Sequence, residues 1–263
     1  GIPELNSMTW NDNSSFVSAM YYRIYYQITL ANEFLRYTDS QWMDDHSFSD
    51  QEKIMIVDMA AEARFLRALS YYHALDLFGN VPFVDETYNP GLFFPQQIMR
   101  KDLFNWILAE LNSIEPLLKP ALTVDYGRAD RGALLALRSK LYLNSEVYIG
   151  QPNYENCMAD CASLISAGYS LEPDYAYNFN ADNHLSPEFI FAVNFDGNRT
   201  RTYGGTTFLL HSHLGGSMDI PSFGTTSGWQ GNRATKAWYD KFSDTLDSRR
   251  MVHLDGQEDT ITT

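Results

Sequence analysis

The chain has 263 residues, 44% of them hydrophobic, which is enough for one large domain or two modest ones with a proper core. Its formal net charge is −14, and this disfavours nucleic acid and anionic lipid as partners because both need a basic face. Neutral ligands are favoured over anionic ones for the same reason. No segment approaches the roughly 18 continuous apolar residues of a membrane span.

Two long helices are predicted in the first third of the chain. The first covers Ser14 to Asp39 and the second Ser49 to Phe78, each with apolar residues at steps of three and four. The first stripe consists of Phe16, Met20, Ile24, Ile28 and Phe34/Leu35. Gly79 ends the second helix, and an extended segment follows from Asn80.

Three charged residues interrupt the second helix among neighbours that look buried. They are Glu62, Arg64 and Arg67. Because buried charges are tolerated only when they are paired, we predict a structural network of ion pairs and hydrogen bonds rather than a ligand site. Asp247 and Arg249 are predicted to form a similar structural pair near the start of a strand.

Three further helices are predicted between residues 95 and 168. The first begins at Pro95 and ends at Pro116, the second covers Asp130 to Ile149, and the third covers Asn153 to Ala167. The short connection between the last two makes them antiparallel neighbours. Helices in such pairs stack into a right-handed solenoid of tetratricopeptide character, which makes the fold mainly α.

The remainder of the chain is predicted to be richer in loops. Glu188 to Asp196 is a strand candidate, Asn198 to Gly231 is rich in Gly, Ser and Thr, and a last helix covers Asn232 to Phe242. Arg249 to Leu254 is a second, short strand candidate. Long irregular segments of this kind often carry function.

Four segments, in their order and spacing, resemble the SusD/RagB family, and the resemblance covers nearly the whole chain. They read EARFLRALSYYHALDLFGNVPFV, YGRADRGALLALRSKLYLNSEVY, SPEFIFAVNFD and GNRATKAWYDKFSDTLDSRRM. The resemblance implies a non-enzymatic glycan-binding protein, exposed on the outer membrane of Bacteroidetes and held by a lipid anchor. It also implies a protein partner, a TonB-dependent SusC-like transporter that receives the glycan.

The resemblance further implies one SusD-like domain over residues 1–263. Its helical scaffold would cover about residues 14–168 and a loop-rich binding region about residues 169–263. We expect this to be a fragment, because no lipid-bearing cysteine precedes Gly1 and the family continues beyond Thr263. No cofactor is implied; calcium is possible but unsupported, since no calcium loop pattern occurs.

The first candidate for glycan contact is the segment around Trp10 and Asn13. Trp10 lies before the first helix rather than on its stripe, and Asn13 follows three residues later. Starch-binding relatives resemble this arrangement. Sugar rings stack on aromatic faces while side-chain amides bind the hydroxyls. Packing of Trp10 on the helix as a hydrophobic staple is the alternative.

The second candidate is a pair of aromatic residues in glycine-rich loops, Tyr203 and Trp229. The resemblance places a Tyr and a Trp of the starch-binding arc in this region, which favours a starch-like α-glucan. Packing inside the loops is the alternative. Weaker polar candidates are Asn198, Arg201 and Gln230.

Other features of the sequence favour structure over function. Trp106 and Trp238 are predicted to be core residues, whereas Trp42 lies in a predicted loop and is assigned no role. Cys157 and Cys161 are predicted to be small buried hydrophobes. His211 and His213 alternate as zinc ligands can, but no third ligand follows nearby. A helical glycoside hydrolase and a plain protein-binding scaffold, as well as a lid for another glycan or a peptide, remain as alternatives.

Overall fold

A computed structural model describes residues 3–88, 91, 94–200, 202–216, 218–232 and 234–249. The chain divides into two compact units. We call Asp12–Ser170 with Pro187–Ala192 the helical unit. We call Gly1–Asn11, Leu171–Ser186 and Val193–Thr263 the loop unit.

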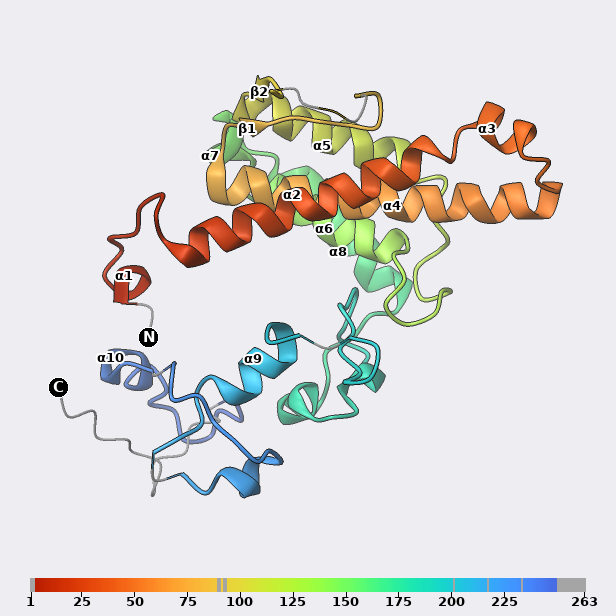
Figure 1. Cartoon of the computed structure of the whole chain (residues 1–263). Helices are drawn as coiled ribbons and strands as arrows, with labels where there is room; N and C mark the ends of the chain where they lie inside the picture. The colour runs from red at the N-terminus through yellow and green to blue at the C-terminus, as the bar shows by residue number, and fades with distance from the viewer. Residues whose placement is uncertain are drawn as a thin grey trace. The chain divides into compact units, whose positions relative to one another are not determined.

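The helical unit contains most of the regular structure among the described residues. Its helices are α2 (Ser15–Arg36), α3 (Ser40–Asp45), α4 (Asp50–Phe78), α5 (Arg100–Ile114), α6 (Arg131–Leu143), α7 (Ser145–Ile149) and α8 (Tyr154–Ala167). The main pairs are α2 with α4, α4 with α5 and α6 with α8 (Figure 1). The predicted mainly α fold of tetratricopeptide-like helix pairs is therefore confirmed.

The two predicted long helices are confirmed, and local chemistry explains their ends. At the start of α4, the Glu52 backbone N–H donates to the Ser49 hydroxyl (3.4 Å) and the Glu52 carboxylate accepts from the Ser49 N–H (2.8 Å). This reciprocal capping box satisfies N–H groups that the helix leaves without partners. At the other end Gly79 adopts a φ of 73°, which a residue with a Cβ adopts only under strain.

The third helix begins five residues later than predicted. Val81–Pro82 (β1) pairs antiparallel with Gln97–Ile98 (β2), and the chain is extended up to Met99. The Asn80 side chain then accepts a hydrogen bond from the Arg100 N–H at 2.8 Å. The residues after Pro95 therefore form the second strand of a small sheet, so the prediction of a helix start at Pro95 was wrong.

The fourth predicted helix is split in two. Asn144 ends α6 with a φ of −97° and a ψ of 9°, and α7 restarts at Ser145. The Asn144 side chain donates to the Lys140 carbonyl at 3.1 Å, which offers the backbone an alternative to continuing the helix. Gly150 and Gly168 end α7 and α8 in the left-handed conformation, as their positions predict.

The main core lies between α2, α4, α5 and α6. Fully buried side chains include Phe65, Tyr71 and Phe104, each no more than 1% exposed. The Tyr71 hydroxyl donates to the Val84 carbonyl (2.7 Å) and accepts from the Val84 N–H (2.9 Å), so it fixes the extended segment after Gly79 against α4.

Some predicted core residues lie at the surface instead. Of the α2 stripe, Ile24, Ile28 and Leu35 are buried, whereas Phe16, Met20 and Phe34 are exposed. The cysteines of α8 are both free thiols; Cys157 is half-buried and Cys161 is exposed, so the prediction of two buried hydrophobes was wrong. The apolar stripes identify the helices correctly but are wider than the faces that α4 and α6 cover.

The three charges of α4 form the predicted structural network. Arg64 makes a two-pronged ion pair with Glu110 of α5 (2.9 and 2.7 Å), and Arg67 donates to the same carboxylate at 2.8 Å. Arg67 also contacts Glu86 and donates to the Asn32 side chain at 2.8 Å. Glu62 binds Arg128 through two hydrogen bonds of 2.7 and 2.5 Å. This network ties α4 to α2, α5 and the segment before α6.

Arg138 of α6 is also buried and joins three helices. It makes a two-pronged pair with Asp160 of α8, with both bonds at 2.8 Å. It also donates to Asn112 at 2.9 Å and to Glu115 at 2.6 Å, at the end of α5. The hydrogen bonds to Asp160 raise the pKa of Arg138, so the guanidinium stays charged.

The predicted strand from Glu188 to Asp196 is not a strand. Phe191 packs on Phe65 of α4 at 5.4 Å between ring centroids, whereas Val193 is exposed. Asp196 then accepts hydrogen bonds from the N–H groups of residues 198, 199 and 200 at 2.7–3.1 Å, which turns the chain. The pattern of apolar residues therefore reflects side-chain packing without a partner strand.

The loop unit contains short helices among the described residues. They are α1 (Pro3–Asn6), α9 (Gly205–His211) and α10 (Lys236–Tyr239), with 3-10 turns at Tyr175–Phe179, Asn183–Leu185 and Ile220–Phe223. The last predicted helix is thus four residues long instead of eleven, and α9 was not predicted. Of the second strand candidate, Arg249 to Leu254, all but Arg249 lie outside the described residues. Asp247 and Arg249 form the predicted pair, in a turn.

No helix in the described part of the chain combines the length and the apolar character needed to cross a bilayer.

Candidate functional site

Two of the predicted ligand residues meet in the loop unit. The ring centroids of Tyr203 and Trp229 are 6.3 Å apart, and those of Phe208 and Trp229 are also 6.3 Å apart. The His211 ring stacks on Trp229 at 5.2 Å with an angle of 18° between the planes. We call these four residues the aromatic patch. Tyr203 is 86% exposed and Trp229 is 41% exposed, so both rings offer area to solvent.

Backbone hydrogen bonds hold the patch in place. The N–H of Trp229 donates to the His211 carbonyl at 2.9 Å, and the N–H of Gln230 donates to the Leu214 carbonyl at 3.0 Å. The His211 Nδ1 donates to the Ser227 carbonyl at 2.8 Å, which fixes the imidazole against the indole. The loop that carries Trp229 is therefore anchored along the end of α9.

Gly228 makes this anchoring possible. A Cβ at this position would lie 2.2 Å from the Leu214 carbonyl oxygen, which is backbone and cannot give way easily. Only glycine lets two segments approach so closely. The glycine-rich composition of this loop thus serves the attachment of Trp229 to its neighbours.

The aromatic patch suits a neutral ligand with apolar CH faces. Its members offer ring faces, a phenol and an imidazole, and none of them is a carboxylate, lysine or arginine. Aromatic rings bind the CH faces of sugars, and the polar tips can bind the hydroxyls around them.

Trp10 and Asn13, the other predicted pair, have exposed side chains. Trp10 lies in the loop unit and is 50% exposed, whereas Asn13 lies in the helical unit. Among the described residues no ring contact joins Trp10 to Tyr203 or Trp229. The exposure of Trp10 is not that of a tightly packed staple, and its role in a shared site stays a prediction, as does that of Asn13.

The weaker polar candidates differ in their surroundings. Asn198 belongs to the turn around Asp196, to which its N–H donates at 2.9 Å. Gln230 follows Trp229 directly and has a φ of 54°, which is uncommon outside glycine. Arg201 lies outside the described residues.

The remaining tryptophans correct two sequence-based predictions, because Trp42 was placed in a loop and Trp238 in the core. Trp106 packs against the core, with Tyr71 at 5.1 Å and the Arg67 guanidinium at 5.4 Å from its ring. Trp42 lies in α3 and stacks on His46 at 4.0 Å. Trp238, predicted to be a core residue, is 48% exposed in α10. The helix that was expected to bury Trp238 is only one turn long.

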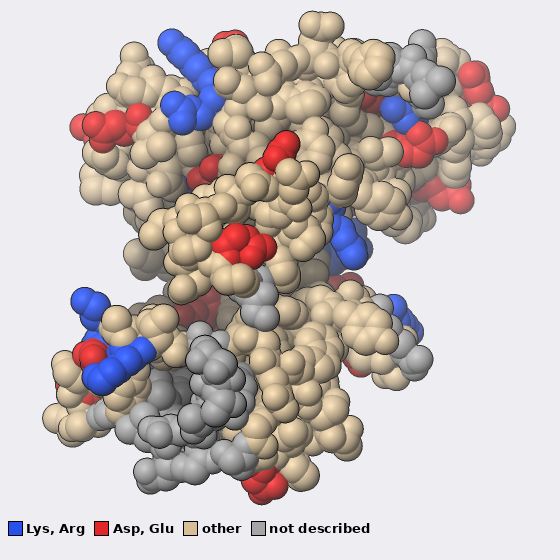
Figure 2. All heavy atoms as spheres, turned by 60° about the vertical axis from the view of Figure 1, so that its left-hand side comes forward, with Lys and Arg blue, Asp and Glu red and all other residues tan. Residues whose placement is uncertain are grey.

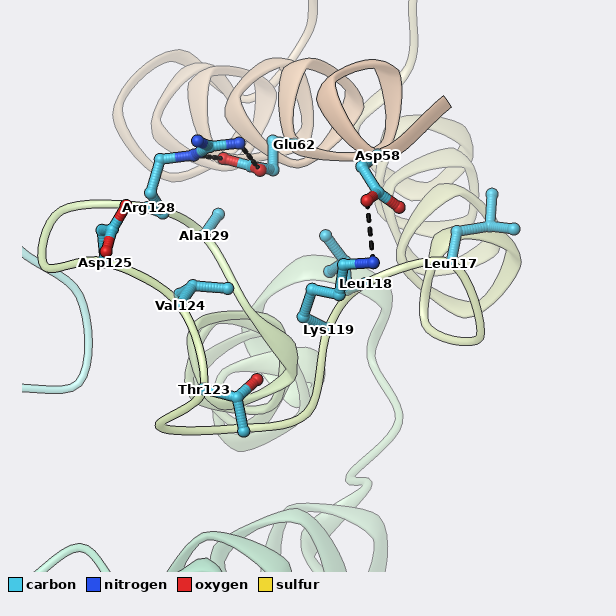
Figure 3. A pocket seen from close by; sticks show the side chains of 10 residues that line it. All are labelled: Asp58, Glu62, Leu117, Leu118, Lys119, Thr123, Val124, Asp125, Arg128 and Ala129. Atoms are coloured by element: carbon cyan, nitrogen blue, oxygen red, sulfur yellow. Dashed lines mark hydrogen bonds and ion pairs between the residues drawn. The ribbon is translucent and has the colours of Figure 1, made fainter. Parts of the chain in front are cut away.

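A cavity of about 260 Å³ lies beside α4 in the helical unit. Figure 3 shows that two of its three acidic side chains, Asp58 and Glu62, are each engaged by a basic partner, while Asp125 is the third. Lys119 binds Asp58 at 2.8 Å and Arg128 binds Glu62. Because both carboxylates serve ion pairs that join α4 to the segment before α6, we interpret this cavity as part of the scaffold.

Metal and anion sites receive no support in the described part of the chain. No group of three or more His, Cys, Asp or Glu side chains there is placed to hold a metal ion. His211 contacts Trp229 and Ser227, and no described residue joins it with His213 in such a group. On the face shown in Figure 2, the described Lys and Arg side chains stand in small groups near acidic ones.

The fold and the patch together define a protein of tetratricopeptide-like helix pairs with an exposed, ring-bearing loop surface. Starch-binding protein SusD of Bacteroides thetaiotaomicron is 35% identical over 258 residues, which are 97% of this chain and 44% of that protein. SusD-like protein P2 of Formosa agariphila is 24% identical over 270 residues, covering 96% of this chain and 48% of that protein. No family model matches the chain.

Solved structures agree on the fold. Surface glycan-binding protein A from Bacteroides uniformis superposes with a TM-score of 0.69 at 19% identity, over 92% of this chain and 50% of that one. The protein of that name from Bacteroides thetaiotaomicron, in complex with laminarihexaose, has a TM-score of 0.69 at 20% identity, over 88% and 48%. The chain belongs to the SusD/RagB family of SusD-like proteins. It spans about half the length of the curated relatives it matches.

Proposed function

We propose that this chain is the part of a cell-surface glycan-binding protein that holds a neutral oligosaccharide on the aromatic patch without cleaving it. The observation that carries the proposal is the exposed ring pair of Tyr203 and Trp229, fixed by His211 and by the anchored loop. A starch-like α-glucan is the ligand we favour. The name of the relative with 35% identity, starch-binding protein SusD, supports this choice.

The parent protein, in this proposal, hands its glycan to a TonB-dependent SusC-like transporter at the outer membrane, where a lipid anchor holds it. Membership of the SusD-like family supports this part of the proposal. Cell fractionation and protease treatment of intact cells test the location. Co-purification of a transporter barrel with the full-length protein tests the partner.

Two alternatives make different predictions. A SusD-like protein that serves another glycan or a peptide would bind through the same patch but not bind starch. The complex of surface glycan-binding protein A with laminarihexaose supports this alternative. A helical glycoside hydrolase would need two carboxylates about 5 or 6.5–9.5 Å apart, and it would release reducing ends from its substrate.

The experiment is affinity electrophoresis in gels that contain a panel of neutral polysaccharides, with starch and laminarin included. We expect the chain to be retarded by an α-glucan, and Trp229→Ala to lose most of that retardation. Stacked rings and hydroxyl bonds give micromolar to millimolar affinity, about −4 to −8 kcal/mol, so retardation should be moderate. A reducing-end assay on the same panel should show no turnover.

The matched control is Tyr26→Ala. Tyr26 is an exposed aromatic residue of α2 in the helical unit, 63% exposed, so its loss removes a surface ring outside the patch. Retardation that survives in Trp229→Ala, or that falls equally in Tyr26→Ala, would contradict the proposed site.

A further inference from the structure

A pocket that the sequence did not predict lies in the loop unit. It has a volume of about 430 Å³ and is lined by His213, Asn232, Ala234, Thr235 and Trp238. We call it the Trp238 pocket. Its described lining combines an indole, an imidazole, a side-chain amide and a hydroxyl, and no described carboxylate, lysine or arginine belongs to it.

We infer that the Trp238 pocket is a second subsite for a neutral oligosaccharide, which continues the aromatic patch and extends the ligand that the chain binds. The inference rests on the proposed function of the patch. It adds a second binding position, with Trp238 as the residue that makes the protein prefer longer oligosaccharides.

The indole is held ready for stacking. Trp238 is 48% exposed, and its ring rests against Phe242 at 4.7 Å between centroids. The Thr235 hydroxyl caps α10 by accepting a hydrogen bond from the backbone N–H of Trp238 at 3.2 Å. A hydroxyl that accepts in this way keeps its own hydrogen to donate to a ligand oxygen. The ring therefore needs little reordering before a sugar stacks on it.

The backbone places the pocket beside the patch within the loop unit. Residues 229–232 run along residues 211–214: Trp229 donates to the His211 carbonyl, and Gly231 and Asn232 both donate to the Ser212 carbonyl at 2.7 and 2.8 Å. The Asn232 side chain also donates to the Ser212 hydroxyl at 3.3 Å. Trp229 of the patch and Asn232 of the pocket thus belong to one anchored segment.

The chemistry favours a neutral sugar chain over other occupants. Among its described residues the pocket combines the face of an indole with the Thr235 hydroxyl, so it suits a ligand that has both apolar and polar surface. A sugar chain has both kinds of surface, because each ring offers a CH face and a rim of hydroxyls. An oligosaccharide long enough to occupy the aromatic patch and the Trp238 pocket together gains contacts that a short one lacks.

The test is calorimetric titration of the chain with maltotriose and maltoheptaose. We expect Trp238→Ala to weaken maltoheptaose binding about tenfold, as the loss of one aromatic contact predicts, and to change maltotriose binding less than about twofold. Trp238→Phe should recover most of the loss. Lys236→Ala on the same helix is the control, since Lys236 is exposed and pairs with Asp240 at 2.8 Å.

Two results separate the inference from the proposed function. If Trp238→Ala is folded by circular dichroism and leaves both ligands unchanged, or weakens both equally, the second subsite is wrong while the patch stands. If the unmodified chain binds neither ligand and no other glycan of the panel, the proposed function itself fails. Loss confined to the long ligand, with recovery in Trp238→Phe, supports the inference.

Discussion

At the scale of single residues, the charges of α4 show which part of an ion-pair network can be predicted from the sequence. Their burial among apolar neighbours predicts that they are paired. The partners lie 43 to 66 residues away in the chain, in α5 and before α6, for Arg67 with Glu110 and Glu62 with Arg128. A pattern within one helix contains no information on such distant partners, so the pairing was predictable and the partners were not.

Glu110 is the residue on which this network depends most. It receives Arg64 and Arg67 together and is only 9% exposed. We expect Glu110→Ala to lower the free energy of unfolding by about 3–5 kcal/mol, because two guanidinium groups lose their carboxylate. Urea denaturation followed by circular dichroism measures this. Lys236→Ala, which removes an exposed pair, should change stability by about 0.5 kcal/mol at most.

The same carboxylate predicts how stability depends on pH. Burial alone would raise the pKa of Glu110, but the hydrogen bonds from Arg64 and Arg67 outweigh it, and the pKa is lowered from its ordinary 4.5. A group with a lowered pKa in the folded state contributes its stability above its ordinary value and loses it as the pH falls through the lowered value. The stability gap between the unmodified chain and Glu110→Ala should therefore be full at pH 7 and shrink below pH 4.5.

The candidate site likewise contains residues that the sequence could predict and residues that it could not. Tyr203 and Trp229 stood out in the sequence because they lie in glycine-rich loops without an apolar stripe. His211 did not stand out as a support for Trp229, since stacking between residues 18 positions apart has no local pattern. Trp238 was hidden because its neighbours have helical spacing, which predicts a buried face on a helix that proves to be a single turn.

At the scale of elements, helices with caps were predicted better than segments with apolar runs. The ends of α4 follow from Ser49 and Gly79, whose local chemistry is visible in the sequence. The strand expected over residues 188–196 failed because Phe191 packs on Phe65 instead of completing a sheet face. A short apolar run does not reveal whether its partner is another strand or the side of a helix.

The loop that carries Trp229 provides the prediction at this scale. Gly228→Ala should displace the loop, because the new Cβ meets the Leu214 carbonyl at 2.2 Å. We expect retardation by glycan to be lost, with a decrease in stability of about 1–3 kcal/mol. Gly91→Ala is the control, since no described residue lies within 4 Å of a Cβ there. Normal retardation of Gly228→Ala would show that the anchored loop is unimportant for binding.

At the scale of the whole molecule, the main core and the proposed binding surfaces lie in different units. The charge networks and the large core belong to the helical unit, while the aromatic patch and the Trp238 pocket belong to the loop unit. The sequence analysis expected one domain with a helical scaffold over about residues 14–168 and a loop-rich region after it, whereas the loop unit also includes Gly1–Asn11. The sequence also did not predict that residues 187–192 belong to the helical unit, because that depends on packing against α4.

Arg138 tests this assignment. Arg138→Met leaves Asp160, which is 6% exposed, without its guanidinium, so we expect a loss of about 3–5 kcal/mol in unfolding free energy. Under native conditions the variant should still be retarded by glycan as strongly as the unmodified chain. A folded variant with the weak retardation of Trp229→Ala would contradict the separation of the two roles.

The thiols of α8 add a practical consequence to this separation. Cys157 and Cys161 are the only cysteines of the chain, and Cys161 is exposed on a helix of the helical unit. A maleimide dye attached there labels the scaffold alone, so its emission should stay constant while the tryptophan fluorescence, to which Trp229 contributes with four other indoles, responds to added sugar. The native chain thereby offers an internal reference and a sensor in one molecule, with no engineered residue.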